Sequence, residues 1–190
     1  MRVRLLSFAV PLVFLAQCAP AGCEPVTTTP PLAPVSFGNG TFLVGSQIPA
    51  GTYIAANGQT CYWERLSGLG GTFDEIIEND FAAGRSIVTI APTDVAFNSS
   101  RCGGWVQYGA AGPVATFGDG DWAVNAEVAP GRWASDPTAS GCYWERATGY
   151  GHDFEEIIAN DFLDGQAIVD ISPTDVRFTS QGCGVWSRIS

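Results

Sequence analysis

The chain carries one segment twice, and this duplication constrains the fold more than any other feature of the sequence. The pentapeptide CYWER at 61–65 begins a segment that ends at Cys102, and the same pentapeptide at 142–146 begins one that ends at Cys183. Both pairs of cysteines are 41 positions apart (102 − 61 and 183 − 142), and 25 of the 42 aligned residues are identical. A repeat of this length indicates two copies of one structural unit.

The similarity extends to both sides of these segments and predicts two tandem repeats, at 37–108 and 117–190. The offset between equivalent residues is 80 before the first cysteine of each repeat and 81 after it, so one residue is inserted in a loop of the second repeat. We call residues related by this offset twins. The intervening segment 109–116 (GAAGPVAT) is rich in small residues and predicts a flexible linker.

Within each repeat the local signals are typical of β-strands. The stretch 73–81 is ambiguous, because Phe73, Ile76 and Ile77 have helical spacing. We predict a strand-loop-strand hairpin there, with a one-turn helix as the alternative. Short runs rich in aromatic and β-branched residues, separated by Gly, Pro and Asn, lie at 41–44, 52–55, 61–66 and 87–90. The predicted fold class is therefore all-β, with each repeat a small β-sandwich or barrel-like unit.

Four cysteines lie inside the repeats, and their pairing closes each unit. A unit of about 70 residues buries only about 60% of the surface that its unfolded chain exposes, so its stability is marginal without a crosslink. We expect the disulfides Cys61–Cys102 and Cys142–Cys183, each contributing about 4 kcal/mol in the chain-entropy description. One intertwined pseudo-twofold barrel is the alternative architecture.

The first 22 residues are typical of an export signal. Two arginines precede an apolar run at 5–15, which is shorter than the roughly 20 residues needed to span a bilayer. Three cleavage points compete. The residues 19–21 (APA) fit an ordinary signal-peptidase site, and lipobox-like sequences precede both Cys18 and Cys23.

Cysteine parity favours lipidation of Cys23 over the alternative Cys18. Cleavage before Cys23 removes Cys18 and leaves no unpaired thiol in an oxidising compartment, whereas the other cuts leave Cys23 without a partner. Residues 23–36 then form a Pro- and Thr-rich, semi-rigid tether. We predict a signal peptide at 1–22 and a lipid anchor on the extracytoplasmic face of the cell membrane, with a freely secreted protein as the alternative.

The charge balance argues against nucleic acid as a partner. The chain has 19 acidic residues, nine arginines and no lysine, for a net charge of −10. Removal of the signal peptide takes two arginines with it and leaves a balance of 7 − 19 = −12. A negative field of this size repels phosphate backbones, so we expect no nucleic-acid partner.

The inventory of reactive side chains argues against catalysis. His152 is the single histidine, and its twin is Gly71, so Ser-His-Asp or Cys-His chemistry would exist in one copy alone. We expect His152 in an exposed loop, and we predict no catalytic residue, no metal site and no cofactor. Four carboxylates recur in both repeats and could serve a hydrolase, but a structural pair between a retained arginine and a retained aspartate explains the recurrence equally well. These carboxylates are Glu64, Glu75, Asp80 and Asp94, with twins Glu145, Glu156, Asp161 and Asp175.

Aromatic residues are the remaining candidates for binding a ligand. All six tryptophans stand where both repeats are aromatic, which favours core positions, and Trp63 and Trp144 are assigned to the core beside the disulfides. Tyr108 and Tyr150 are the tyrosines without an aromatic twin.

Strand alternation defines a candidate binding face. In an extended segment 61–66, Tyr62 and Glu64 lie on the side opposite the disulfide, and their twins Tyr143 and Glu145 do the same. Tyrosine combines an apolar ring with a polar tip, which suits recognition of sugars or peptides. We predict these four residues as the binding face.

These residues belong to a longer pattern that resembles a known repeat. The pattern GTY…CYWxR…IIxND…IVxI…DxxFxS…CGxW resembles a repeat of exported bacterial proteins and lipoproteins. The second copy departs from it at Arg132-Trp133, where Thr-Tyr is expected. The resemblance implies an extracytoplasmic β-rich module and no known activity. The first copy carries the pattern at 51–53, 61–65, 76–80, 87–90, Asp94, Phe97 and Cys102.

Three functions are compatible with these observations. A non-catalytic envelope module that binds an exported protein or a cell-wall glycan is the leading hypothesis. A structural spacer at the cell surface is the alternative, and a carboxylate-based hydrolase is the third. Duplication favours the first two, because linked weak binding modules gain affinity through effective concentration.

Overall fold

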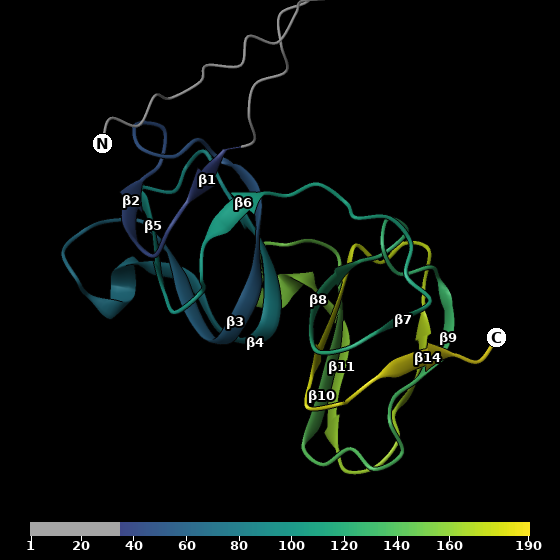
Figure 1. The fold of residues 1–190 in the computed structure, drawn as a ribbon. Helices are drawn as coiled ribbons and strands as arrows, with labels where there is room; N and C mark the ends of the chain where they lie inside the picture. The colour runs from purple at the N-terminus through teal and green to yellow at the C-terminus, as the bar shows by residue number, and fades with distance from the viewer. Residues whose placement is uncertain (1–34) are drawn as a thin grey trace, which may run out of the picture. The chain divides into compact units, whose positions relative to one another are not determined.

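The computed structural model describes residues 35–190, except for the side chains of 57–59. The described chain is built from β-strands and two 3₁₀ turns, and no helix in it is long and apolar enough to cross a membrane. Figure 1 shows the strands in order along the chain. The expected signal peptide, most of the tether and the candidate lipidation sites Cys23 and Cys18 lie outside the described residues.

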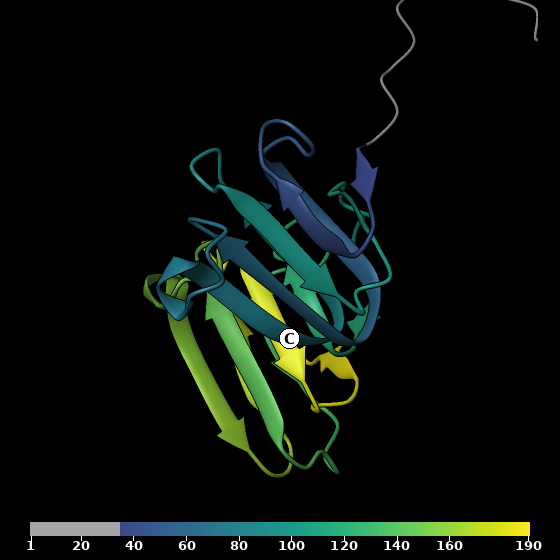
Figure 2. The same cartoon turned by 90° about the vertical axis from the view of Figure 1, so that its left-hand side faces the viewer.

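Repeat 1 is a two-layer arrangement of six antiparallel strands, two of which pass through both layers. One layer contains β2, β5, the end of β3 and the start of β4; the other contains the rest of β4 and β3, then β6 and β1. Figure 2 shows these blue and teal strands from a direction at right angles. The strands are β1 (Ser36–Phe37), β2 (Gly40–Leu43), β3 (Gly51–Leu66), β4 (Ile76–Ile90), β5 (Ala96–Ser100) and β6 (Trp105–Gln107).

Repeat 2 has the same arrangement, but its layers are two separate sheets. Their strand orders are β8-β13-β10-β11 and β12-β9-β14-β7. Neither sheet closes on itself, so the barrel-like alternative is wrong, whereas the all-β fold and the two-copy organisation are confirmed. The strands are β7 (Thr116–Phe117), β8 (Gly120–Ala123), β9 (Gly131–Ala134), β10 (Cys142–Ala147), β11 (Ile157–Leu163), β12 (Ile168–Ile171), β13 (Arg177–Gln181) and β14 (Trp186–Arg188).

The hairpin expected at 73–81 is not formed. A single 3₁₀ turn, η1 (Phe73–Glu75), precedes β4, so the one-turn helix given as the alternative is correct. The Glu75 carboxylate accepts hydrogen bonds from the N–H groups of Gly70 (3.0 Å) and Thr72 (3.2 Å), which closes the loop before the turn. The second copy, η2 (Phe154–Glu156), has the same place before β11.

Each repeat buries its own aromatic core between its two layers, beside its disulfide. Trp63 and Trp105 in repeat 1, and Trp133 and Trp186 in repeat 2, are fully buried. Trp144 is half-buried and packs against the core of repeat 2 from its edge, stacked on Phe178 with ring centroids 6.4 Å apart, so its expected core position is met only in part. Both expected disulfides, Cys61–Cys102 and Cys142–Cys183, are present.

The two repeats meet at a junction between β4 and β8. Arg85 pairs with Gly120 in a single parallel β-bridge, which is the only ladder between the repeats in the described chain. The backbones approach closely, because a Cβ atom on Gly84 would lie 2.9 Å from the Asp119 carbonyl oxygen. Since each repeat otherwise keeps its own sheets and core, the intertwined barrel is not formed.

Candidate functional site

Tyr62 and Glu64 lie together in repeat 1, as the strand alternation predicts. The Tyr62 hydroxyl donates a hydrogen bond to Glu64 Oε2 (2.6 Å) and accepts one from Asn79 Nδ2 (3.5 Å). The ring of Phe81 packs 4.7 Å from that of Tyr62. Burial, and then the hydrogen bond to the carboxylate, raise the pKa of Tyr62, so the hydroxyl stays a donor.

The same unit recurs in repeat 2 with one additional partner. Tyr143 donates to Glu145 (2.6 Å), Asn160 donates to Tyr143 (3.3 Å), and burial as the main cause raises the pKa of Tyr143 to about 12. Glu145 is buried and also accepts a hydrogen bond from Arg177. Its carboxylate is therefore engaged within the chain. Sequence reasoning missed Arg177, whose twin is Ala96.

Four phenylalanines at twin positions are the most exposed large apolar side chains of the described chain. Phe73 and its twin Phe154 are 91% and 83% exposed, and Phe81 and its twin Phe162 are 72% and 70% exposed. Positions that are aromatic in both repeats are therefore not all core positions. Two of these rings begin the 3₁₀ turns, and the other two stand on the outer strands β4 and β11.

An open groove of ≈ 550 Å³ gathers the exposed rings of repeat 1 and one ring of repeat 2. Burial, followed by the neighbouring Asp153 carboxylate, raises the pKa of Glu78 to about 7. None of the lining residues is basic. We call this surface the aromatic groove, and it is lined by Tyr62, Phe73, Ile76, Ile77, Glu78, Asn79, Phe81 and Phe154.

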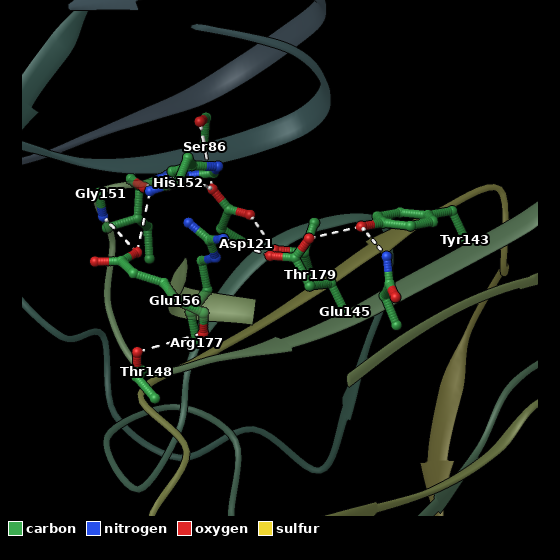
Figure 3. Close-up of polar contacts among 12 residues, drawn as sticks. Ser86, Asp121, Tyr143, Glu145, Thr148, Gly151, His152, Glu156, Arg177 and Thr179 are labelled. Carbon is green, nitrogen blue, oxygen red and sulfur yellow. Dashed lines mark hydrogen bonds and ion pairs between the residues drawn. The ribbon is translucent and has the colours of Figure 1, made fainter. Parts of the chain in front are cut away.

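A buried polar network joins the repeats at the junction (Figure 3). The Asp121 carboxylate accepts hydrogen bonds from the Ile87 N–H (2.8 Å), the Thr179 hydroxyl (2.7 Å) and the Ser86 hydroxyl (3.3 Å). His152 Nε2 lies 3.3 Å from the same carboxylate. Burial alone would raise the pKa of Asp121, but the neighbouring His152 imidazole, the Arg177 charge and the hydrogen bond from the Ile87 N–H outweigh it and lower that pKa.

His152 is not in an exposed loop, so that prediction is wrong. Its side chain is almost completely enclosed, and Nε2 lies 3.0 Å from the carbonyl oxygen of Ile87 in the other repeat. Its ring packs edge-on against Trp63, with centroids 4.9 Å apart. The glycine at the twin position, Gly71, was the available signal, because a residue that serves the junction has no counterpart on the other repeat.

Other junction residues also lack a chemically equivalent twin. Arg85 forms an ion pair with the buried Glu127 (2.8 Å) and stacks over Trp122 (4.1 Å to the ring centroid). Tyr108 and Tyr150, the tyrosines without an aromatic twin, lie with their rings 6.1 Å apart. Differences between the repeats therefore mark the surface on which the repeats meet.

Ser86, Asp121 and His152 bring together the residue types of a nucleophilic triad, but their order differs from one. In such a triad the histidine lies between the serine and the carboxylate. Here the carboxylate lies between them, and the Ser86 hydroxyl accepts a hydrogen bond from Trp63 Nε1 (3.0 Å) while fully buried. The arrangement ties β4 to repeat 2.

Comparison with protein families matches each repeat separately. One family, described as Rv1352-like extracellular domain, matches residues 35–106 and again residues 114–187. The chain belongs to this family. No curated protein and no solved structure matches the chain. Membership in the Rv1352-like extracellular domain family establishes an exported module in two copies, in agreement with the resemblance in the sequence.

Proposed function

We propose that the protein is a lipid-anchored, non-catalytic module that binds another exported protein through the aromatic groove. The observation that carries this proposal is the set of exposed phenylalanine rings, above all Phe73 and Phe154, which come from different repeats and line one groove. Contiguous apolar surface on a soluble domain marks an interaction site. Because its lining comes from both repeats, the groove forms only when both copies are present, which explains why the repeat is duplicated.

The chemistry of the groove favours a protein partner over a glycan. Its most exposed rings are phenylalanines, which have no polar group for sugar hydroxyls, and the Tyr62 hydroxyl is already bonded to Glu64. Exposed carboxylates follow the exposed rings directly, at Asp74 and Glu155. We therefore propose that the partner presents an apolar segment flanked by basic residues.

The test is capture of the partner in the exporting cell by a photo-crosslinker placed at Ile77, which lines the groove. We expect one exported protein to be captured, through a segment with aliphatic or aromatic residues next to lysine or arginine. The double variant Phe73→Ser/Phe154→Ser should lower capture at least about tenfold, as expected for hot-spot residues. The matched control Val185→Ser changes an exposed aliphatic residue outside the groove and should have no effect.

Other outcomes would contradict the proposal in different ways. Unchanged capture by the double variant would exclude the aromatic groove as the site. Capture of a glycan would show that the partner is a glycan and not a protein. If no material is captured, the spacer function is favoured. Turnover of a glycan or ester that Glu64→Gln/Glu145→Gln abolishes would show an enzyme.

A further inference from the structure

The junction shows how repeat 2 holds a strand of repeat 1. The Ile87 N–H donates to Asp121 (2.8 Å), His152 Nε2 lies 3.0 Å from the Ile87 carbonyl oxygen, and the Thr89 N–H donates to the carbonyl of Tyr150 (2.8 Å). Ile87 is fully buried, yet it does not belong to the core cluster of its own repeat. Its burial therefore comes from the contact with repeat 2.

The equivalent strand of repeat 2 is uncovered. The twin of Ile87 is Ile168 (87 + 81) in β12, and its side chain is 59% exposed. The neighbours on the same face, Gln166 and Asp170, are exposed as well. The inward residue Val169 packs in the core of repeat 2. The outward face of β12 is thus equivalent to the buried face of β4, but among residues 35–190 only the ion pair between Asp170 and Arg132 (2.7 Å) lies over it.

The surface of repeat 1 that corresponds to the holding surface of repeat 2 is also open. Thr41, Leu69 and Gly71 are the twins of Asp121, Tyr150 and His152, the three residues that hold β4. They line a pocket of ≈ 280 Å³ together with the apolar side chains of Leu66, Phe73 and Ile76 and the carboxylates of Glu64 and Glu75. Gly71 and Leu69 leave room that His152 and Tyr150 fill in repeat 2.

We propose that β12 of one molecule docks into this pocket of a second molecule and repeats between copies the contact that joins the repeats within one chain. Among the described residues both surfaces are uncovered, at opposite repeats of the same chain. The backbone hydrogen bond accepted by the Tyr150 carbonyl can recur at Leu69, whereas the contacts of the Asp121 and His152 side chains have no counterpart at Thr41 and Gly71. Such a contact is head-to-tail, because a different surface is used on each partner, and it therefore builds open chains of molecules rather than closed dimers.

The charged pair of the junction is replaced by a matched neutral pair. Within the chain, Arg85 forms its ion pair with Glu127 at 2.8 Å. The twins are Gln166, two residues before β12, and Gln47. Both amides are bonded within the chain, since Gln166 donates to the Ser135 carbonyl (3.0 Å) and Gln47 accepts from the Leu43 N–H (2.7 Å), so neither twin brings an unpaired charge to the contact between copies. Had only one of the two changed, a charge would be left without a partner, which is costly in a desolvated contact.

A second polar pair has changed in the same coordinated way. The Ser86 hydroxyl donates to Asp121 at 3.3 Å within the chain. The twins are Ala167 and Thr41, which remove the buried hydroxyl and the buried carboxylate together. The contact between copies therefore leaves neither group without a hydrogen-bond partner.

The backbone shape that permits close approach is present on both uncovered surfaces. Gly84 and Gly120 lie at the junction, and their twins Gly165 and Gly40 also have positive φ (+90° and +130°). Apart from the adjoining residues, nothing in the described part of the chain comes within 4 Å of a Cβ atom placed on Gly165. These φ values are accessible to glycine and strained for other residues. Gly165 and Gly40 therefore preserve the backbone geometry of the junction on the two uncovered surfaces.

Contact between copies is weaker than the contact within the chain. The linker holds the two repeats at a high effective concentration, whereas separate molecules meet only at their bulk or surface concentration. Confinement of the exported protein to a membrane surface raises that concentration, so the proposed chains form at the cell surface before they form in dilute solution.

Cysteine crosslinking in the full exported chain tests the contact. We expect co-expressed Gln47→Cys and Gln166→Cys chains, treated with a short bismaleimide crosslinker, to form a dimer linked between positions 47 and 166, because the long side chains of their twins, Arg85 and Glu127, span the gap between the two backbones. A chain that carries both changes should instead give a series of bands on a non-reducing gel, which correspond to dimers, trimers and longer oligomers. Peptide mapping identifies the linked positions and checks that both native disulfides are intact.

A third change separates specific docking from chance collision. Ile168→Asp, added to the Gln166→Cys chain, should lower the amount of the 47–166 dimer at least about tenfold, since it places a charge on the docked face. Val185→Asp, at a similarly exposed aliphatic residue, should not lower it. The proposal is overturned if no 47–166 link forms while the native disulfides are intact, if only links between identical positions form, or if the link survives Ile168→Asp.

Discussion

A buried carboxylate is costly unless hydrogen bonds and positive charge surround it, and Asp121 shows how this condition is met at the residue scale. It accepts hydrogen bonds from the backbone of one repeat and from the Thr179 hydroxyl of the other. Its twin in repeat 1 is Thr41, whose exposed hydroxyl donates a hydrogen bond to Asn98 (3.1 Å). The same strand position therefore serves the junction in one copy and the surface in the other.

Replacement of these twins should have very different effects on stability. Asp121→Ala leaves the Ile87 N–H without its acceptor and removes the carboxylate beside His152, and we expect it to lower the free energy of unfolding by about 3 kcal/mol. Thr41→Ala removes one exposed hydrogen bond and should change it by less than about 0.5 kcal/mol. Urea titrations followed by tryptophan fluorescence measure both values. Equal losses would contradict the assigned role of Asp121.

The pKa of Asp121 also sets a direction for the effect of acid. Because this pKa lies below the value of about 3.9 in an unfolded chain, the unfolded state takes up a proton first as the pH falls. The stabilisation by Asp121 is complete at neutral pH and is lost progressively below about pH 3.9. The stabilities of wild type and Asp121→Ala should therefore converge in strong acid, in the same titrations.

At the scale of elements, the repeats differ in whether their long strands are continuous. Strands β3 and β4 pass through both layers of repeat 1, whereas repeat 2 divides the equivalent residues among β9, β10, β11 and β12. The division accompanies the loop that holds the inserted residue, where the Asp164 carboxylate accepts hydrogen bonds from the Gly141 N–H (2.9 Å) and the Ser140 hydroxyl (3.0 Å). Arg85, which bridges to repeat 2, lies on a continuous strand.

Two twin glycines on these strands allow a matched measurement. Gly84 has a φ of +91°, so Gly84→Ala strains the backbone and also places a Cβ atom 2.9 Å from the Asp119 carbonyl oxygen. Gly165 has a similar φ of +90°, but the Cβ atom of Gly165→Ala would meet no described atom within 4 Å outside the adjoining residues. We expect about 1–2 kcal/mol of destabilisation from the backbone in both variants, and a further 1–3 kcal/mol in Gly84→Ala from the clash. Urea denaturation of both variants compares them. A larger loss in Gly165→Ala would contradict the close approach at the junction.

At the scale of the whole molecule, we propose that the lipid anchor and the tether attach the two repeats to the outer face of the membrane. Lipidation of Cys23 with a tether at 23–36 would hold the aromatic groove outside the membrane. Mass spectrometry of the mature N-terminus should show a diacylglyceryl mass on Cys23. An unmodified chain that begins at Gly22 would instead show a freely secreted protein.

The parts of this molecule that could be predicted from sequence are those that depend on neighbouring residues. The side-by-side placement of Tyr62 and Glu64 follows from the two-residue period of a strand, and the disulfides follow from the duplication. The place of His152 could not be predicted, because its burial depends on Ile87, 65 residues earlier and in the other repeat. The exposure of Phe73 was missed for a related reason, since a repeated aromatic residue serves a shared surface as well as a core.

The buried position of Ile87 has a consequence for passage of the chain across the membrane. Translocation delivers the N-terminal repeat first, and domains generally fold as they emerge. Until His152, 65 residues later, has also crossed, the Ile87 face of β4 lacks the cover that repeat 2 provides. We therefore expect a partly exported chain to aggregate more readily than the whole one, because this aliphatic face is then exposed.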